Sequence, residues 1–363
     1  MTKISPVGID LFAGAGGLSY GLSQAGFNMA LGIEINSNFA ITLKENNRNM
    51  KVVMSNIKTV DPLEALKFAG VQKADLDIIV GGPPCRGFSQ SNRRTRNLKN
   101  PLNHLYKEFF RFVKVLHPQA FLLENVAGIK TLQKGKVLQD ILDRGNKLGY
   151  KVQWDEVNSE KFGVPQRRKR IIFIGAREKV NNLFTQEKNS IITVRSALND
   201  LPILDNGNTV NELKYLKCSN LTKYQKKMRK NNGDSVLNNL VTKNGALVLE
   251  RYKHISPGGN WKCIPPYLLS NYRNPKNCHG WIYYRLKWDE PSVVVSNFRK
   301  NMLIHPKQDR GLSVREAARL QSFPDNYIFY GPLTSQQQQV ANAVPPILAE
   351  KIGKNILNYL RGN

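Results

Sequence analysis

The feature that most limits how this chain can fold is the regular alternation of apolar runs and amphipathic stretches in its first 175 residues. Apolar runs predict strands at 7–12, 27–33, 77–80, 120–123 and 171–174. Apolar side chains at helical spacing predict a helix that contains Leu18 and ends near Gly26, and further helices over 104–116 and 137–148. Strands separated by helices are typical of a parallel, doubly wound α/β sheet, which binds ligands beyond the carboxyl ends of its strands.

The chain loses this pattern from about residue 178 to about residue 310 and becomes rich in basic residues. The whole chain has 54 Lys and Arg against 27 Asp and Glu, a formal net charge of +27, which favours a nucleic acid as partner over an anionic membrane surface. Between 251 and 288 no acidic residue occurs, and basic residues alternate with tyrosines and tryptophans. This mixture suits phosphate contact and base stacking, although a small domain with an aromatic core and solvated lysines would have the same composition.

Regular helices are predicted again near the end of the chain. Ser313 with Glu316, and Ser335 with Gln338, have the spacing of a capping box. An amphipathic helix over 347–360 follows two prolines and could return to the first domain. No run approaches the ~20 apolar residues of a membrane span, and no signal peptide is evident, so we expect a soluble cytoplasmic protein. Four cysteines without CxxC spacing predict neither a disulfide framework nor a metal site.

The first strand runs into a glycine turn, DLFAGAGGLS at 10–19, and the second ends in a carboxylate, Glu34. A strand, a glycine turn and a helix start form a cofactor site in doubly wound folds, and the acid commonly binds ribose hydroxyls. The pattern alone fits NAD, FAD and S-adenosylmethionine. The turn lacks the third glycine of GxGxxG, and Phe12 could pack against an adenine; both features favour S-adenosylmethionine.

A thiol and a carboxyl group follow two other predicted strands. Cys85 stands behind Pro83 and Pro84, which restrict the backbone, and the segment after it is basic and free of acids. Positive charge favours a nucleophilic thiolate. Glu124 ends the strand at 120–123 in an apolar setting, where a protonated carboxyl can donate a proton or a hydrogen bond. The structural alternatives are a small buried cysteine before a solvated loop, and a carboxylate bound by backbone amides.

The run QRRKR at 166–170 leads into the last predicted strand. In an extended segment Gln166, Arg168 and Arg170 would face the same side. A solvated basic run is the alternative interpretation.

These segments resemble, in order, the motifs of the bacterial DNA (cytosine-5)-methyltransferase family, over nearly the whole chain. The segments that carry the resemblance are DLFAGAGGLS at 10–19, Glu34, GGPPCRGFSQSN at 81–92, ENVAG at 124–128, QRRKR at 166–170, LSVREAARLQSFPD at 312–325 and QVANAVPP at 339–346. The sequence departs from the family pattern at Asn56-Ile57, where Asp is common, at Ala341-Asn342 in place of Gly-Asn, and in PSVVVS at 291–296.

The resemblance implies a fold, a reaction and a role for each matching residue. It implies a doubly wound mixed sheet of the Rossmann-like methyltransferase type, with a catalytic domain at 1–190 completed by 332–363, a target-recognition domain at 195–310 and a hinge at 311–331. Cys85 would attack C6 of a flipped-out cytosine in duplex DNA, Glu124 would hold the ring, and Arg168 would bind the base or support the site. Contacts to S-adenosylmethionine are implied for Phe12, Gly14, Gly16, Glu34, Asn56, Ile57, Pro83, Asn342 and Val344. Contacts to DNA are implied for Arg86, Ser89, Gln90, Arg93, Arg94, Arg96, Lys99 and Arg170.

Three alternatives remain at this point. A tRNA cytosine-5-methyltransferase would share the fold and the chemistry, a dinucleotide-dependent oxidoreductase would share the glycine turn, and a silent DNA-binding protein would share the charge. The resemblance favours a monomeric, nucleoid-associated modification enzyme of a restriction–modification system. A cognate restriction endonuclease would then act on the same DNA site without forming a stable complex with the enzyme.

Overall fold

The computed structural model describes residues 5–84, 104–178, 183–185, 191–272, 280–300 and 302–362. The chain divides into two compact units. Unit 1 comprises 1–162, 169–188 and 344–363, and unit 2 comprises 163–168 and 189–343. Each unit is described by itself below.

Unit 1 is built on a seven-stranded sheet with the strand order β3-β2-β1-β4-β5-β7-β6. The strands are β1 Val7–Leu11, β2 Asn28–Glu34, β3 Lys51–Met54, β4 Leu76–Gly81, β5 Ala120–Val126, β6 Lys151–Asn158 and β7 Lys169–Ala176. Strands β1 to β5 pair in parallel, whereas β7 is antiparallel to both β5 and β6. The predicted α/β fold is confirmed. The alternation of strands and helices predicted a parallel sheet, which is wrong for β6 and β7. The mixed sheet that the family resemblance implied is observed.

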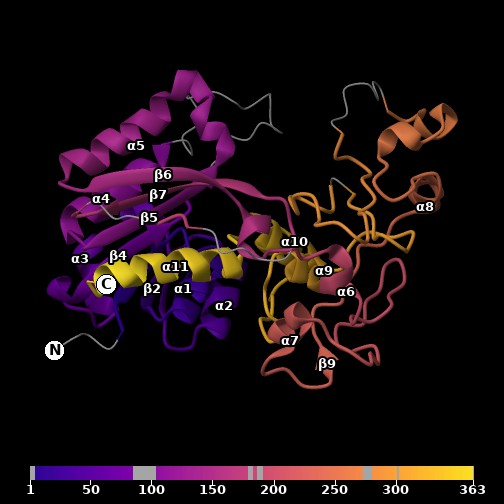
Figure 1. Cartoon of the computed structure of the whole chain (residues 1–363), viewed down its shortest axis with the longest axis horizontal. Helices are drawn as coiled ribbons and strands as arrows, with labels where there is room; N and C mark the ends of the chain where they lie inside the picture. Colours follow the sequence, from indigo (N-terminus) through magenta and orange to yellow (C-terminus); the bar gives the residue numbers. More distant parts are fainter. Residues whose placement is uncertain are drawn as a thin grey trace. The chain divides into compact units, whose positions relative to one another are not determined.

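Helices cover both faces of this sheet. They are α1 Gly17–Ala25, α2 Ser37–Asn46, α3 Pro62–Phe68, α4 Tyr106–Leu116, α5 Lys136–Lys147 and α11 Pro346–Leu360. The apolar sides of α3, α4 and α5 form one core with the strands, including Phe109, Phe112 and Phe121. Helix α11 packs against α1, and Figure 1 shows α5 above the sheet and α11 below it. None of the described helices is both long and apolar enough to cross a membrane.

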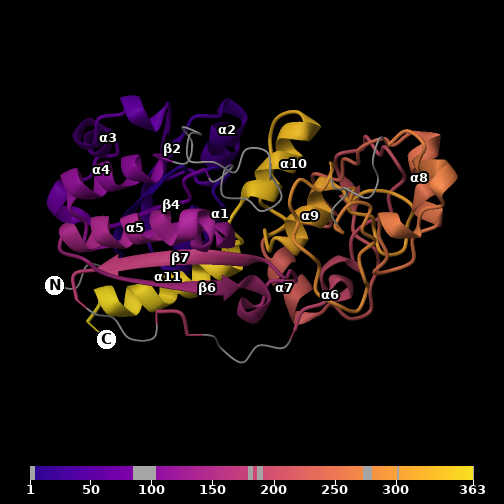
Figure 2. The same cartoon turned by 90° about the horizontal axis from the view of Figure 1, so that it is seen from above.

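The described part of unit 2 contains short elements joined by long irregular segments, which Figure 2 shows from a second direction. They are α6 Val194–Leu198, β8 Leu213–Lys214, α7 Lys223–Arg229, β9 Ser235–Val236, α8 Ala246–Lys253, α9 Val314–Leu320 and α10 Leu333–Asn342. One small apolar cluster surrounds α8 and includes Tyr252, Leu268 and Tyr283. Around α9 the interior is instead ionic, with Arg315 and Arg319 fully buried.

Candidate active site

The turn after β1 has the backbone shape that a close ligand contact needs. Phe12 has a positive φ of 67°, and Gly14 and Gly16 have φ values of 58° and 90°. The left-handed region strains a non-glycine residue, and such strain is common at ligand sites. The Gly14 N–H donates to Glu34 Oε2 at 2.9 Å, which joins the glycine turn to the end of β2. The residues predicted at this site, Phe12, Gly14, Gly16 and Glu34, therefore lie together.

Glu34 is held in place by backbone donors. Its Oε1 accepts from the Asn36 N–H at 2.8 Å, and the side chain is 9% exposed. Burial raises the pKa of the Glu34 carboxyl, and the hydrogen bonds from Asn36 and Gly14 oppose that rise. Next to it Ile35 is 66% exposed, a large apolar side chain at the rim of the site. Ile35 was not predicted as a site residue, although an apolar residue directly after the acid is a signal that the sequence contains.

A second carboxyl group lies in the strand before the turn and was also missed. Asp10 is 1% exposed, and its Oδ2 accepts a hydrogen bond from the Ser19 hydroxyl. Its Oδ1 has no hydrogen-bond partner among the described residues. Burial raises the pKa of the Asp10 carboxyl to about 7, and the hydrogen bond from Ser19 opposes that rise. A buried, unsatisfied carboxyl oxygen beside a glycine turn is suited to receive a polar group of a ligand.

Asp10→Asn is expected to change how stability depends on pH. The pKa is raised from 3.8 to about 7, so between these values the folded protein holds a proton that the unfolded chain has released. The stability from this group is therefore present at low pH and is lost as pH rises toward 7, by up to about 1.4 kcal/mol per pH unit. Relative to the native protein, Asp10→Asn should gain stability progressively between about pH 4 and about pH 7 in urea unfolding, and the gain should stay constant above about pH 7. The same gain in Asp143→Asn, an exposed control, would contradict this assignment.

A second cluster lies at the ends of β4 and β5. The two strands pair in register from Ile78 with Ala120 to Gly81 with Leu123, so the residues that follow are also adjacent. A Cβ atom on Gly82 would lie only 3.0 Å from Glu124 Oε2. The Glu124 carboxylate lies 2.9 Å from the Nε of Arg170 on β7, and both side chains are 13% exposed. The structure thus places Glu124 beside the backbone that leads to Pro83 and Pro84.

The other predicted cofactor residues of unit 1 have different surroundings. Asn56 is exposed, and its side chain accepts from the Lys58 N–H at 3.1 Å. Ile57 is buried in the core, and its carbonyl accepts from Arg111 Nη2 at 2.7 Å. Pro83 and Val344 are buried. Cofactor contacts by these four residues stay predictions.

Gln166 and Arg168 belong to unit 2, where they act as braces. Residues 166–168 precede β7, and burial alternates from 166 to 170: Gln166 and Arg168 are buried and Arg170 is half-buried, whereas Arg167 and Lys169 are exposed. Gln166 is fully buried; its Nε2 donates to Gln321 Oε1 and its Oε1 accepts from the Val295 N–H, both at 2.9 Å. Arg168 is 2% exposed and donates to the carbonyls of Val295, Ala341 and Ala343 at 3.1–3.4 Å. This geometry fits the second of its two predicted roles, support of the site.

Two further features of unit 2 bear on the predicted site. Asn342 is exposed, and its Oδ1 accepts from Gln338 Nε2 at 2.6 Å.

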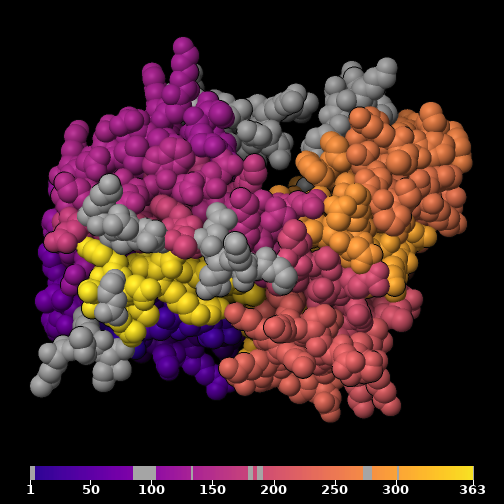
Figure 3. Space-filling view, viewed as in Figure 1, coloured from indigo at the N-terminus to yellow at the C-terminus, as the bar shows by residue number. Residues whose placement is uncertain are grey.

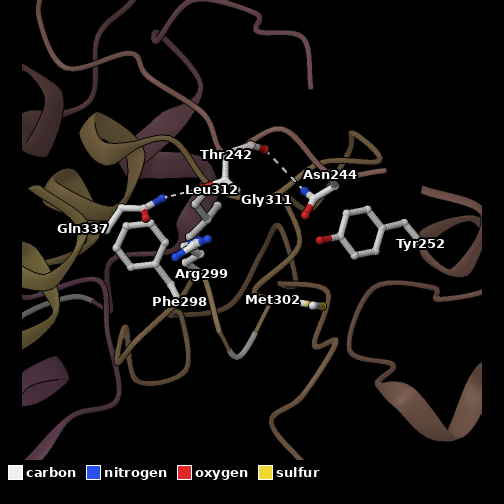
Figure 4. A pocket seen from close by; sticks show the side chains of 9 residues that line it. All are labelled: Thr242, Asn244, Tyr252, Phe298, Arg299, Met302, Gly311, Leu312 and Gln337. Carbon is white, nitrogen blue, oxygen red and sulfur yellow. Dashed lines mark hydrogen bonds between the residues drawn. The ribbon is translucent and has the colours of Figure 1, made fainter. Parts of the chain in front are cut away.

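Figure 4 shows a cavity lined by Thr242, Gln337 and seven other residues. Its volume is about 20 Å³, which is room for one water molecule, and Gln337 Oε1 has no partner there among the described residues. This cavity is too small for a nucleobase.

Several predicted residues lie outside the part of the chain that the structure describes. They are Cys85, Arg86, Ser89, Gln90, Arg93, Arg94, Arg96 and Lys99. Their roles stay predictions from the sequence.

Comparisons with known proteins agree over almost the whole chain. The family model for C-5 cytosine-specific DNA methylases matches residues 7–358. The Type II methyltransferase M1.HphI of Haemophilus parahaemolyticus is 36% identical over 96% of this chain and 86% of its own length. The Type II methyltransferase M.DdeI of Desulfomicrobium norvegicum is 35% identical over 97% and 88%, respectively.

The fold is likewise similar to that of solved structures. A crystal structure described as that of a DNA modification methyltransferase from an Escherichia coli prophage superposes with a TM-score of 0.78. It is 28% identical in sequence and covers 98% of this chain and 99% of its own. The chain therefore belongs to the family of C-5 cytosine-specific DNA methylases, and by that membership it is a DNA (cytosine-5-)-methyltransferase.

Proposed function

We propose that the protein transfers a methyl group from S-adenosylmethionine to C5 of a cytosine within a specific sequence of duplex DNA. The observation that carries this proposal is the position of Glu124 beside Gly82. It places a carboxyl group next to the backbone that leads to Cys85, on the sheet edge that also bears the glycine turn. A carboxyl group and a cofactor turn at the same ends of parallel strands are two of the parts that this reaction needs, and the proposed nucleophile follows Pro84 in the sequence.

The residues at the glycine turn fit S-adenosylmethionine, which supplies an electrophilic methyl group when it is bound. The cofactor carries an α-ammonium group, a ribose and an adenine. The unsatisfied Oδ1 of Asp10 would accept a hydrogen bond from the ammonium group, and Glu34 would bind the ribose hydroxyls. The exposed Ile35 and the half-buried Phe12 would cover the adenine. Asn56, Ile57, Pro83, Asn342 and Val344 complete the proposed cofactor contacts.

The chemistry of the base is assigned to two residues. The Cys85 thiolate adds to C6 of cytosine, and the electron pair of the C5–C6 double bond moves toward C5 and the ring nitrogen. Glu124 holds N3 and the exocyclic amine and stabilises this adduct. C5 would take the methyl group as the S–CH3 bond of the sulfonium breaks and leaves the neutral thioether S-adenosylhomocysteine. A base such as water would then take the C5 proton, the electron pair of that C–H bond would reform the C5–C6 double bond, and the Cys85 thiolate would leave.

The target base must leave the helix stack before this chemistry can take place. We assign the catalytic domain to 1–190 with 332–363, target recognition to 195–310 and the hinge to 311–331. The basic segment from Arg86 to Lys99 would contact the DNA phosphates. The protein is proposed to be a cytoplasmic monomer that belongs to a restriction–modification system, as the Type II relatives do by name.

The experiment that tests the proposal is bisulfite sequencing of plasmid DNA incubated with the purified protein and S-adenosylmethionine. Protection of one cytosine in a recurring sequence is the expected result. Methylated tRNA with unmodified duplex DNA would favour the tRNA alternative. Binding of NAD rather than S-adenosylmethionine would favour an oxidoreductase.

Arg170 provides a sharper test, because two roles for it make different predictions. As the partner of Glu124, it would position the carboxyl group; as a DNA contact, it would contribute to affinity. We expect Arg170→Ala to lower kcat by roughly 10- to 100-fold, the cost of misplacing a catalytic group, with little change in KM for DNA. Arg170→Lys should restore part of the loss because a cation returns beside Glu124.

Lys169→Ala is the matched control, since Lys169 is the neighbouring cation on β7 and is 66% exposed in its side chain. Its kcat and its KM should match those of the native enzyme. A rise in KM and a weaker salt dependence for Arg170→Ala, with kcat unchanged, would instead support the DNA contact.

A further inference from the structure

Unit 2 has a strongly basic segment that the proposed chemistry does not use. Between Glu212 and Asp234 the chain carries seven basic residues and no acidic residue. The basic residues are Lys214, Lys217, Lys223, Lys226, Lys227, Arg229 and Lys230. Helix α7 lies at the centre of this segment, so the positive charge is presented on a regular scaffold.

Three of these lysines form a row along one side of α7 and its C-cap. Lys223 and Lys226 belong to the helix, and Lys230 is the residue that caps its end; all three are exposed. Their i, i+3 and i+7 spacing places them on the same side. We call these three residues the α7 lysine stripe. The opposite side of the helix is buried through Tyr224, Gln225 and Met228. The sequence of this helix therefore separates a core face from a cationic face.

The stripe is electrostatically unfavourable in the protein alone. Lys223 occupies the first helical position, and the first turn contains no acidic residue, although the positive end of the helix dipole favours an acid there. Like charges three or four residues apart on a helix also repel each other. A polyanion bound to the stripe would relieve both effects.

Helix α7 is fixed firmly on the interior of unit 2. Thr222 and Gln225 form a complete capping box at its start. The Tyr224 hydroxyl donates to the Arg319 carbonyl, and the Met228 carbonyl accepts from the Asp325 N–H at 2.8 Å. Arg229 faces inward, with its guanidinium 3.8 Å from the ring centre of Tyr215. The lysines outside are thus held on a rigid support, which reduces the entropy lost on binding.

The stripe is separate from the aromatic part of unit 2. Figures 1 and 2 both show α7 away from α8, and in Figure 3 the segment that contains α7 is coloured salmon and is exposed at the lower right. Near α8, Tyr267 and Trp281 are 70% and 54% exposed. In the α7 segment both tyrosines, Tyr215 and Tyr224, are buried. Exposed aromatics are needed to stack bases, whereas lysines alone contact phosphates.

From these observations we infer that the α7 lysine stripe is a docking surface for the phosphate backbone of duplex DNA, independent of base sequence. Seven residues of helix rise about 10 Å, and one strand of duplex DNA presents about three phosphates over that length. Each lysine of the stripe would contact one phosphate. The stripe would hold DNA while the enzyme searches for its site. The inference rests on the proposed function only in taking duplex DNA as the partner.

The test is the salt dependence of binding to a duplex without the target sequence. We compare the native protein with Lys223→Gln/Lys226→Gln/Lys230→Gln, and with a control that removes equal charge from exposed positions in unit 1, Lys67→Gln/Lys73→Gln/Lys147→Gln. Loss of three phosphate contacts should reduce the slope of log affinity against log salt by roughly 2 to 3. At low salt the affinity should fall at least about tenfold. The control should change the slope by less than about one.

Several outcomes would overturn the inference. An unchanged slope in the stripe variant, or an equal change in the control, means that the stripe does not contact DNA. A loss confined to duplex RNA, or to an acidic polypeptide, assigns the surface to another partner. The thermal midpoint of the stripe variant should not fall, because charge repulsion has been removed. This binding needs no methyl transfer, so the two proposals can fail separately. If the native protein transfers no methyl group but the stripe variant has the reduced slope, the inference about the stripe still stands. If the native protein is active but the stripe variant keeps the native slope, the inference is contradicted.

Discussion

Cys85→Ala is expected to abolish methyl transfer while the protein still binds duplex DNA. Removing a covalent nucleophile eliminates the adduct at C6, and losses of at least about 10⁴-fold in kcat are typical for such residues. Single-turnover transfer of a labelled methyl group measures the loss, and a gel-shift titration measures the binding. A duplex that carries 5-fluorocytosine should trap the native protein covalently and should leave Cys85→Ala free.

Two of the other three cysteines provide matched controls for this experiment. Cys263 is exposed and Cys218 is half-buried, and both are free thiols. Cys218→Ala and Cys263→Ala should keep both the transfer rate and the covalent trap. Glu124→Gln should slow transfer by about 10²- to 10³-fold, because a stabilising group is weakened while the nucleophile stays. Turnover that persists in Cys85→Ala would remove the proposed nucleophile and the mechanism that depends on it.

The parts of the fold that could be predicted from the sequence are those with a strong local signal. The turn after β1 was predicted because glycines follow an apolar run, and Gly26 does end α1 with a φ of 111°. The capping box at Ser313 forms as predicted, with Glu316 reaching back to the backbone of Ser313. The similar spacing at Ser335 was misleading, because α10 already begins at Leu333 after Pro332. There the proline started the helix earlier than the capping signature indicated.

The parts that could not be predicted depend on tertiary contacts. Strand β6 alternates poorly because it is an edge strand with several exposed residues, and it was missed. Without β6, β7 seemed to follow α5, and the all-parallel sheet was the natural prediction. In fact no α-helix separates β6 from β7, so the two strands pair as an antiparallel hairpin.

The candidate site shows the same division. The sequence places Glu34 and Glu124 at strand ends. Glu34 does end β2, whereas β5 continues past Glu124 to Val126. The two carboxyl groups lie beside Gly14 and Gly82, respectively. The sequence does not reveal that Arg170 pairs with Glu124, since β5 and β7 are far apart in the chain. Asp10 was overlooked because its strand was read only for its apolar residues. A charged residue within a buried strand is itself a signal of a functional or paired group.

Helix α9 is the clearest case in which composition misleads. Its residues Arg315, Glu316 and Arg319 suggest a solvated helix, yet each is at most 2% exposed. The Arg319 guanidinium donates to Asp325 at 2.5 and 2.7 Å, and to Asp200 at 3.1 Å through two nitrogens. Burial opposes the charge, but the carboxylates of Asp325 and Asp200 outweigh it and raise the pKa of Arg319 above its usual range. The interior of unit 2 is therefore held by a neutralised ionic cluster.

Arg319→Met is accordingly expected to destabilise unit 2 strongly. The substitution removes the cation that both buried carboxylates share, and an uncompensated buried charge costs about 3–5 kcal/mol. Arg319→Lys should recover only part of this loss, because an ammonium group cannot bind two carboxylates with the planar fork of a guanidinium. Urea unfolding followed by tryptophan fluorescence measures the effect, since Trp261, Trp281 and Trp288 all belong to unit 2.

The matched control for this prediction is the pair of Arg195 and Asp289. It has the same two-point geometry, with Nε and Nη2 at 2.5 and 2.8 Å from the two carboxylate oxygens. Its side chains, however, are 52% and 68% exposed, and water compensates such a pair when one partner is removed. Arg195→Met should therefore leave the urea midpoint close to that of the native protein. Equal shifts for Arg319→Met and Arg195→Met would show that burial of the Arg319 cluster does not determine its contribution to stability.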